Sequence, residues 1–214
     1  SRRQRQMCIR DRVAGIVFDF FDGFVARLLH SSSAIGVQLD SLADVITSGL
    51  APAAVLWQVC LQTEPCWLPE TWKLGYGVFV LAAFSALRLA KFNIDETQTV
   101  EFCGLPTPAG SLLCASLGML WQQGAVALSS DGVLLIAVLT SLLLVSPIRM
   151  FALKFHGFGW RGNEVRYLFL LASIVLIIIL RTYAIPVIIV LYIVVSAVRW
   201  LCMRSGNPDK APKA

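Results

Sequence analysis

Apolar residues along this chain gather into long blocks separated by short polar stretches. The blocks are about 15–22 residues long, close to the roughly 20 residues that cross a bilayer as a helix. They do not alternate apolar and polar positions as membrane-spanning strands do. The pattern therefore predicts an all-α chain, a polytopic transmembrane helix bundle in a single membrane domain. Its seven apolar segments are Val13–Leu29, Ser41–Leu61, Leu74–Phe92, Ala109–Leu128, Gly132–Phe151, Tyr167–Leu180 and Ala184–Cys202.

Composition and charge narrow the class of protein further. Of 214 residues, 57% are hydrophobic and 14% are charged, whereas about a quarter are charged in a soluble domain. The net charge is +5, but the basic residues cluster at segment ends, where they suit anionic lipid headgroups. A chain without a soluble basic surface is not expected to bind nucleic acid. The six cysteines form no C-x-x-C pair, which argues against a zinc site.

The two ends of the chain differ from the membrane domain, which we assign to residues 13–203. Residues 1–12 are basic, and only Val13–Phe18 precede the first carboxylate of the first apolar segment. If the loop His30–Asp40 is cytoplasmic, the later loops follow the positive-inside rule and residues 1–12 break it. We therefore expect residues 1–12 to be non-native or disordered and a preceding helix to be missing; a genuine basic arm is the alternative. Residues 204–214 form a polar tail.

Four aspartates lie within or beside the first two apolar segments. Asp19 and Asp22 are three residues apart, and Asp40 and Asp44 are four apart, so each pair shares one face of a helix. Desolvating a carboxylate costs on the order of several kcal/mol and like charges repel, so ionisable residues in such segments indicate function. Oxygen ligands without histidine or cysteine suit Mg²⁺ or Mn²⁺. The quartet therefore predicts a divalent metal site.

Three residues beside the first pair of aspartates suit a phosphate ligand. Gly23 and Ala26 lie on the acidic side of the helix and lack bulk, so phosphates can approach the backbone closely. Arg27 adds a cation that can bind phosphate through a fork of hydrogen bonds. The alternative is a salt-bridged packing cluster, but a single arginine does not balance four aspartates.

The stretch from Asp19 to Asp44 matches the pattern D-x-x-D-G-x-x-A-R-x8-G-x3-D-x3-D at every fixed position, including Gly36. In this the chain resembles the CDP-alcohol phosphatidyltransferases. The resemblance implies six core membrane helices, usually a homodimer, and transfer of a phosphatidyl group from CDP-diacylglycerol or of a related group from CDP-choline-like donors. It also implies roles for the residues: the four aspartates hold the metal, Asp44 is the base that takes the acceptor's proton, and donor binding falls to Gly23, Ala26, Arg27 and Gly36.

Other segments bear on the acceptor alcohol. The stretches DSLADVITSGLAPA (40–53), RLAKFNI (88–94) and FCGLPTPA (102–109) resemble the bacterial phosphatidylserine synthases of this family, which implies L-serine as the acceptor. The carboxylate of serine needs a cation in a desolvated pocket, and Arg88, Lys91 and Arg149 are the candidates. Each has a plain alternative, since basic side chains at the ends of membrane helices also reach out to lipid phosphates.

Several alternatives stay open at this point. Phosphatidyltransferases that use glycerol 3-phosphate or inositol phosphate share the motif. An ion transporter also uses intramembrane carboxylates, although transporters tend to show internal repeats and this sequence shows none. A chain that lacks its first helix could be an inactive fragment. We expect a multi-pass protein of the cell membrane, surrounded by lipids, with its active site facing the cytoplasm.

Overall fold

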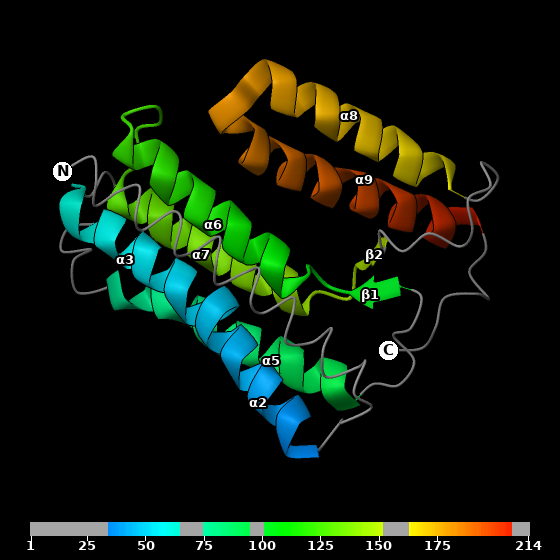
Figure 1. Cartoon of the computed structure of the whole chain (residues 1–214), viewed down its shortest axis with the longest axis horizontal. Helices are drawn as coiled ribbons and strands as arrows, with labels where there is room; N and C mark the ends of the chain where they lie inside the picture. Colours follow the sequence, from blue (N-terminus) through cyan, green and yellow to red (C-terminus); the bar gives the residue numbers. More distant parts are fainter. Residues whose placement is uncertain (1–33, 65–74, 95–100, 152–162, 207–214) are drawn as a thin grey trace. The chain divides into compact units, whose positions relative to one another are not determined.

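The computed structural model describes residues 34–64, 75–94, 101–151 and 163–206, and this part of the chain is mostly helical, as predicted (Figure 1). The chain divides into two compact units, Ser1–Leu42 and Ala43–Ala214. Only residues 34–42 of the first unit are described. The predicted segment Val13–Leu29, all the expected site residues before Gly36 and residues 1–12 lie outside the described residues.

The predicted segment Ser41–Leu61 is part of a longer helical stretch. Helix α2 (Ala34–Asp44) leads into a π-helical turn, η1 (Val45–Leu50), and then into α3 (Ala51–Gln62). In the wide turn the N–H of Ala51 donates to the carbonyl of Ile46, five residues back. Pro52 follows at the start of α3. Because its ring crowds the carbonyl four residues earlier and it has no N–H to donate, a wider turn accommodates it without ending the helix.

The remaining helices follow the predicted apolar segments with shifted ends. They are η2 (Gly75–Phe79), α5 (Val80–Ile94), α6 (Thr107–Gln122), α7 (Ser130–Val145), α8 (Glu164–Leu180), η3 (Arg181–Tyr183) and α9 (Ala184–Gly206). Local sequence features explain where two of these helices, α6 and α7, begin. Pro106 and Pro108 flank the first residue of α6, where a missing N–H costs nothing. At α7 the Ser129 hydroxyl accepts from the N–H of Gly132 at 3.2 Å, which caps the helix.

Two short strands depart from the all-α prediction. Strand β1 (Glu101–Cys103) pairs antiparallel with β2 (Arg149–Phe151), in the register Glu101↔Phe151 and Cys103↔Arg149. Three residues are too few to show the alternation that identifies a strand in a sequence. The pairing continues beyond the strands, because the N–H of Gly104 donates to the carbonyl of Ile148 at 3.0 Å. The N–H of Leu105 donates to the carbonyl of Leu143 at 2.9 Å. The start of α6 is thus tied to the end of α7.

The core lies where α3, α5, α6 and α7 pack together, with η1 against α5 (Figure 1). Its fully buried side chains include Leu56, Leu81, Cys114 and Ala137. Small residues let the helices approach closely, as in membrane bundles generally. A Cβ at Gly49 would lie only 2.9 Å from the Cβ of Ser85 on α5. The close packing of η1 on α5 therefore depends on glycine at this position.

Among the described residues, three helical stretches are long and apolar enough to cross a membrane by length and composition: Gln38–Gln62, Gly75–Asn93 and Glu164–Cys202. The last contains α8 and α9, which lie side by side as a hairpin (Figure 1). Many of their large apolar side chains are exposed, among them Leu168, Ile178 and Val198, which suits contact with lipid. Helices α6 and α7 have 16 residues each, fewer than the roughly 20 of a full span.

Candidate active site

The second half of the acidic motif lies on one helix. Gly36, Asp40 and Asp44 all belong to α2. Asp40 is exposed, and Asp44 is half-buried at the last position before the π-helical turn. The four-residue spacing puts the two carboxylates on the same side of the helix. Both offer only oxygen ligands, which fits a hard divalent cation.

The first half of the motif cannot be placed beside it. Its residues lie outside the described ones: Asp19, Asp22, Gly23, Ala26 and Arg27. Within the described ranges, no group of three or more His, Cys, Asp or Glu residues lies close enough to hold a metal. The described part of the chain thus contains two of the four predicted ligands, and the metal site remains a prediction.

Arg88 is the best-defined polar residue near Asp44. It lies on α5, with only 9% of its surface exposed. Its Nη1 donates a hydrogen bond of 3.1 Å to the hydroxyl oxygen of Thr107 on α6. Its Cζ lies 5.9 Å from the centre of the Phe92 ring, one helical turn further along α5, within the range of a cation–π contact. Arg88 is therefore held inside the bundle and does not extend to the surface.

Residues of two further elements, α2 and α9, lie near Arg88. The Asp44 carboxylate at the end of α2 interacts electrostatically with the guanidinium, and the side chain of Tyr192 on α9 lies near it. The Nε of Arg88 is fully buried, and no residue in the described ranges accepts a hydrogen bond from it. A buried N–H without an acceptor is costly, more so on a charged group. An unsatisfied donor of this kind beside a predicted catalytic carboxylate indicates a place where an anionic ligand binds.

The other two predicted acceptor cations have different environments. Lys91 lies one turn after Arg88, in the last turn of α5, and its side chain is exposed. Arg149 is exposed on β2, where it is the strand partner of Cys103. Of the three candidates, Arg88 is the buried one, and it interacts with Asp44.

Two residues of this site are not among the sequence candidates. Thr107 lies between two prolines at the start of α6. In the sequence, this position indicates a polar side chain at the beginning of a helix, which could have made Thr107 a candidate. Tyr192 lies in the apolar run of α9 and is 8% exposed. A hydroxyl group within an apolar run could have identified Tyr192 in the sequence, because buried tyrosines usually find a polar partner.

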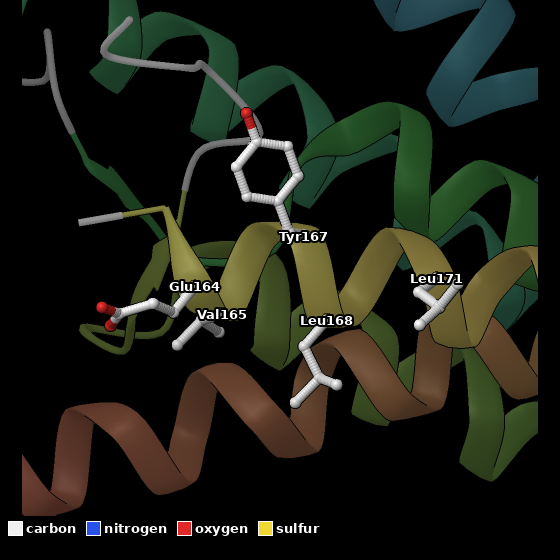
Figure 2. Close-up of a pocket in the computed structure, with 5 residues that line it drawn as sticks. All are labelled: Glu164, Val165, Tyr167, Leu168 and Leu171. Carbon is white, nitrogen blue, oxygen red and sulfur yellow. The ribbon is translucent and has the colours of Figure 1, made fainter. Parts of the chain in front are cut away.

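A separate groove lies along the start of α8. It has a volume of about 450 Å³ and is lined by Glu164, Val165, Tyr167, Leu168 and Leu171 (Figure 2). All five come from the first turns of one helix, and most of the lining is apolar. Neither Asp44 nor Arg88 contributes to it, so the groove is distinct from the polar site.

Comparison with known proteins identifies related sequences. The sequence model of the CDP-alcohol phosphatidyltransferase family matches residues 5–147. Three curated relatives are each named CDP-diacylglycerol–serine O-phosphatidyltransferase. The Bacillus subtilis protein is 33% identical over 143 residues, 67% of this chain and 73% of the relative. The Helicobacter pylori protein is 30% identical over 194 residues, 88% of this chain and 77% of the relative. The Mycobacterium tuberculosis protein is 34% identical over 217 residues, 94% of this chain and 72% of the relative.

Proposed function

Because the chain belongs to the CDP-alcohol phosphatidyltransferase family, we propose that it makes phosphatidylserine from CDP-diacylglycerol and L-serine, releasing CMP. The names of its relatives support serine as the acceptor. The structural observation that carries the proposal is the buried Arg88, which interacts with Asp44 and whose Nε has no hydrogen-bond acceptor among the described residues. A buried cation beside the expected base suits an acceptor that bears both a hydroxyl and a carboxylate.

The reaction is a displacement at phosphorus. The serine hydroxyl oxygen forms a bond to the phosphorus that bears diacylglycerol, and the bond from this phosphorus to the CMP oxygen breaks. Asp44 accepts the proton that the hydroxyl loses. Its place at the end of α2, half-buried and next to the π-helical turn, keeps the carboxylate within the electrostatic range of Arg88.

The donor side of the site consists of the acidic motif. A Mg²⁺ or Mn²⁺ ion would be held by Asp19, Asp22, Asp40 and Asp44, and when bound it supplies positive charge against the diphosphate. Gly23, Ala26, Arg27 and Gly36 would contact the CDP moiety. This half of the proposal is supported by the match of the sequence to the family pattern.

The acceptor side depends on Arg88. Its planar guanidinium can bind a carboxylate through two parallel hydrogen bonds. Lys91 and Arg149 are exposed and would add positive charge on the path of the acceptor. The apolar helices suit a membrane protein. We further propose seven membrane segments, an active site on the cytoplasmic side and a homodimer.

The test is CMP release by the purified protein in lipid nanodiscs. The protein receives CDP-diacylglycerol with L-serine, glycerol 3-phosphate or inositol phosphate, each with Mg²⁺ or Mn²⁺. We expect CMP release with serine and phosphatidylserine as the lipid product. Turnover with glycerol 3-phosphate in place of serine would refute the assignment of the acceptor and leave the family unaffected. Asp44→Asn serves as the control that separates enzymatic release from hydrolysis of the donor.

A further inference from the structure

The geometry of Arg88 distinguishes the two edges of its guanidinium. Nη1 donates to Thr107. The edge that Nε shares with Nη2 is the one that binds a carboxylate side-on through two parallel bonds. Nε has no acceptor in the described part of the chain. The Thr107 contact thus occupies one nitrogen and leaves the carboxylate-binding edge with an unsatisfied donor.

Thr107 is itself held rigidly. Its neighbours Pro106 and Pro108 fix the backbone on either side. The N–H groups of Ala109 and Gly110 both donate to the carbonyl of Pro106, at 3.0 and 3.1 Å. Leu105, two residues before Thr107, is fully buried, and its N–H donates to the carbonyl of Leu143 in the last turn of α7. The backbone that carries the Thr107 hydroxyl is therefore held in place, and the hydroxyl oxygen accepts from Nη1 of Arg88 at 3.1 Å.

The electrostatics of this place favour an anion. Thr107 is the first residue of α6, a helix of 16 residues, and the start of a helix carries partial positive charge. Arg88 adds a full positive charge and is nine-tenths buried. The Asp44 carboxylate offsets one charge, but Asp44 also has to act on the acceptor hydroxyl. Once Asp44 has accepted the hydroxyl proton it is neutral, and an anionic group on the acceptor then balances the charge of Arg88.

We propose that Thr107 is a positioning residue, which orients Arg88 so that its Nε–Nη2 edge receives the carboxylate of the acceptor. The inference rests on the proposed function, because it assumes that serine is the acceptor. It adds that the site selects acceptors by their carboxylate and that this selection depends on a hydroxyl at position 107. Acceptors that keep the hydroxyl and amine but lack the carboxylate, such as L-serinamide, are disfavoured for this reason.

The experiment compares serine with serinamide in the CMP-release assay. In Thr107→Val, which keeps the shape of the side chain and removes the hydroxyl, we expect the KM for serine to rise about tenfold, since a hydrogen bond to a charged group is lost. The KM for serinamide and the KM for CDP-diacylglycerol should change less than about twofold. The ratio of kcat/KM for serine over serinamide therefore falls. Thr107→Ser, which restores the hydroxyl, should restore most of this ratio.

Ser116→Ala is the matched control. Ser116 is also a buried hydroxyl on α6, but it donates to the carbonyl of Leu113 in its own helix at 2.8 Å, so its loss should leave the ratio unchanged. Equal KM changes for serine and serinamide in Thr107→Val would overturn the positioning role. So would a Thr107→Ser protein that behaves like Thr107→Val. If Thr107→Val does not accumulate in membranes, Thr107→Ala is compared with Thr107→Ser by the same ratio.

The two proposals fail in different ways. If the unaltered protein releases no CMP with serine, the proposed function fails and the inference fails with it. If the unaltered protein uses serine and the Thr107 variants keep its preference over serinamide, the inference alone fails.

Discussion

Gly104 joins β1 to the start of α6, and replacing it with alanine should destabilise the protein in two ways. Its φ is +77°, a left-handed conformation that costs a residue with a Cβ about 1–2 kcal/mol. A Cβ at this position would also lie 2.9 Å from the carbonyl carbon of Leu144 and closer still to its oxygen. That carbonyl belongs to the last turn of α7, where the carbonyl of Leu143 accepts from the N–H of Leu105 at 2.9 Å.

The size of the effect follows from these two contributions. Relieving a backbone overlap in a packed interior costs about 1–3 kcal/mol, so Gly104→Ala should lower the free energy of unfolding by about 2–5 kcal/mol. Gly124 is the matched control, because its φ is +70° but no atom lies within 4 Å of a Cβ built there. Gly124→Ala should therefore lose only the conformational part, about 1–2 kcal/mol.

The assay is thermal unfolding in detergent, followed by the fluorescence of the six tryptophans. For a chain of this length, 1 kcal/mol corresponds to a shift of about 2–4 °C in Tm. We expect the Tm of Gly104→Ala to fall clearly below that of Gly124→Ala. Equal shifts in the two variants would refute the reasoning, because they would mean that the approach of Gly104 to Leu144 relaxes without cost.

Three further predictions concern the site and the helix packing. Arg88→Lys should raise the KM for serine about ten- to hundredfold, because a lysine cannot form two parallel bonds to a carboxylate. Initial rates measured against serine concentration test this. A higher KM for CDP-diacylglycerol with an unchanged KM for serine would assign Arg88 to the donor site instead. A chelator should abolish CMP release and Mg²⁺ or Mn²⁺ should restore it, whereas full turnover in excess chelator would exclude the metal mechanism. Gly49→Ala should lower the Tm. Adding Ser85→Gly to this variant should recover part of the loss, because it removes the Cβ that lies 2.9 Å away. Adding Ser85→Ala, which keeps this Cβ, should recover nothing.

The sequence predicts the helices better than their ends and interruptions. The apolar segment Ser41–Leu61 predicts a membrane helix, and a helical stretch runs through it from Ala34 to Gln62. The π-helical turn within it depends on Pro52 and on how closely Gly49 approaches Ser85, and the second of these is a contact between distant parts of the chain. The β1–β2 pair has three residues in each strand, too short for a periodic signal.

The candidate site shows the same division between local and tertiary information. Arg88 and Lys91 lie one turn apart toward the C-terminal end of the same helix, α5. From the sequence, both are candidates for the acceptor site. Burial separates them, and the burial of Arg88 involves residues far along the chain, among them Thr107 on α6. Thr107 and Tyr192 were missed for this reason. The aspartate quartet, which rests on the motif alone, remains a prediction because Asp19 and Asp22 lie outside the described residues.

The π-helical turn determines which way Asp44 faces. Each residue of an α-helix advances the direction of its side chain by about 100°, and the bond from Ala51 to Ile46 accommodates one residue more than an α-helical turn does. Deleting one residue between 45 and 50 would convert the wide turn into an ordinary one and leave the direction of Asp44 nearly unchanged. Deleting one residue in the middle of α3 would rotate Asp44 by about 100° relative to the rest of the bundle. Tolerance to single deletions should therefore be greater in residues 45–50, next to Asp44, than in the middle of α3.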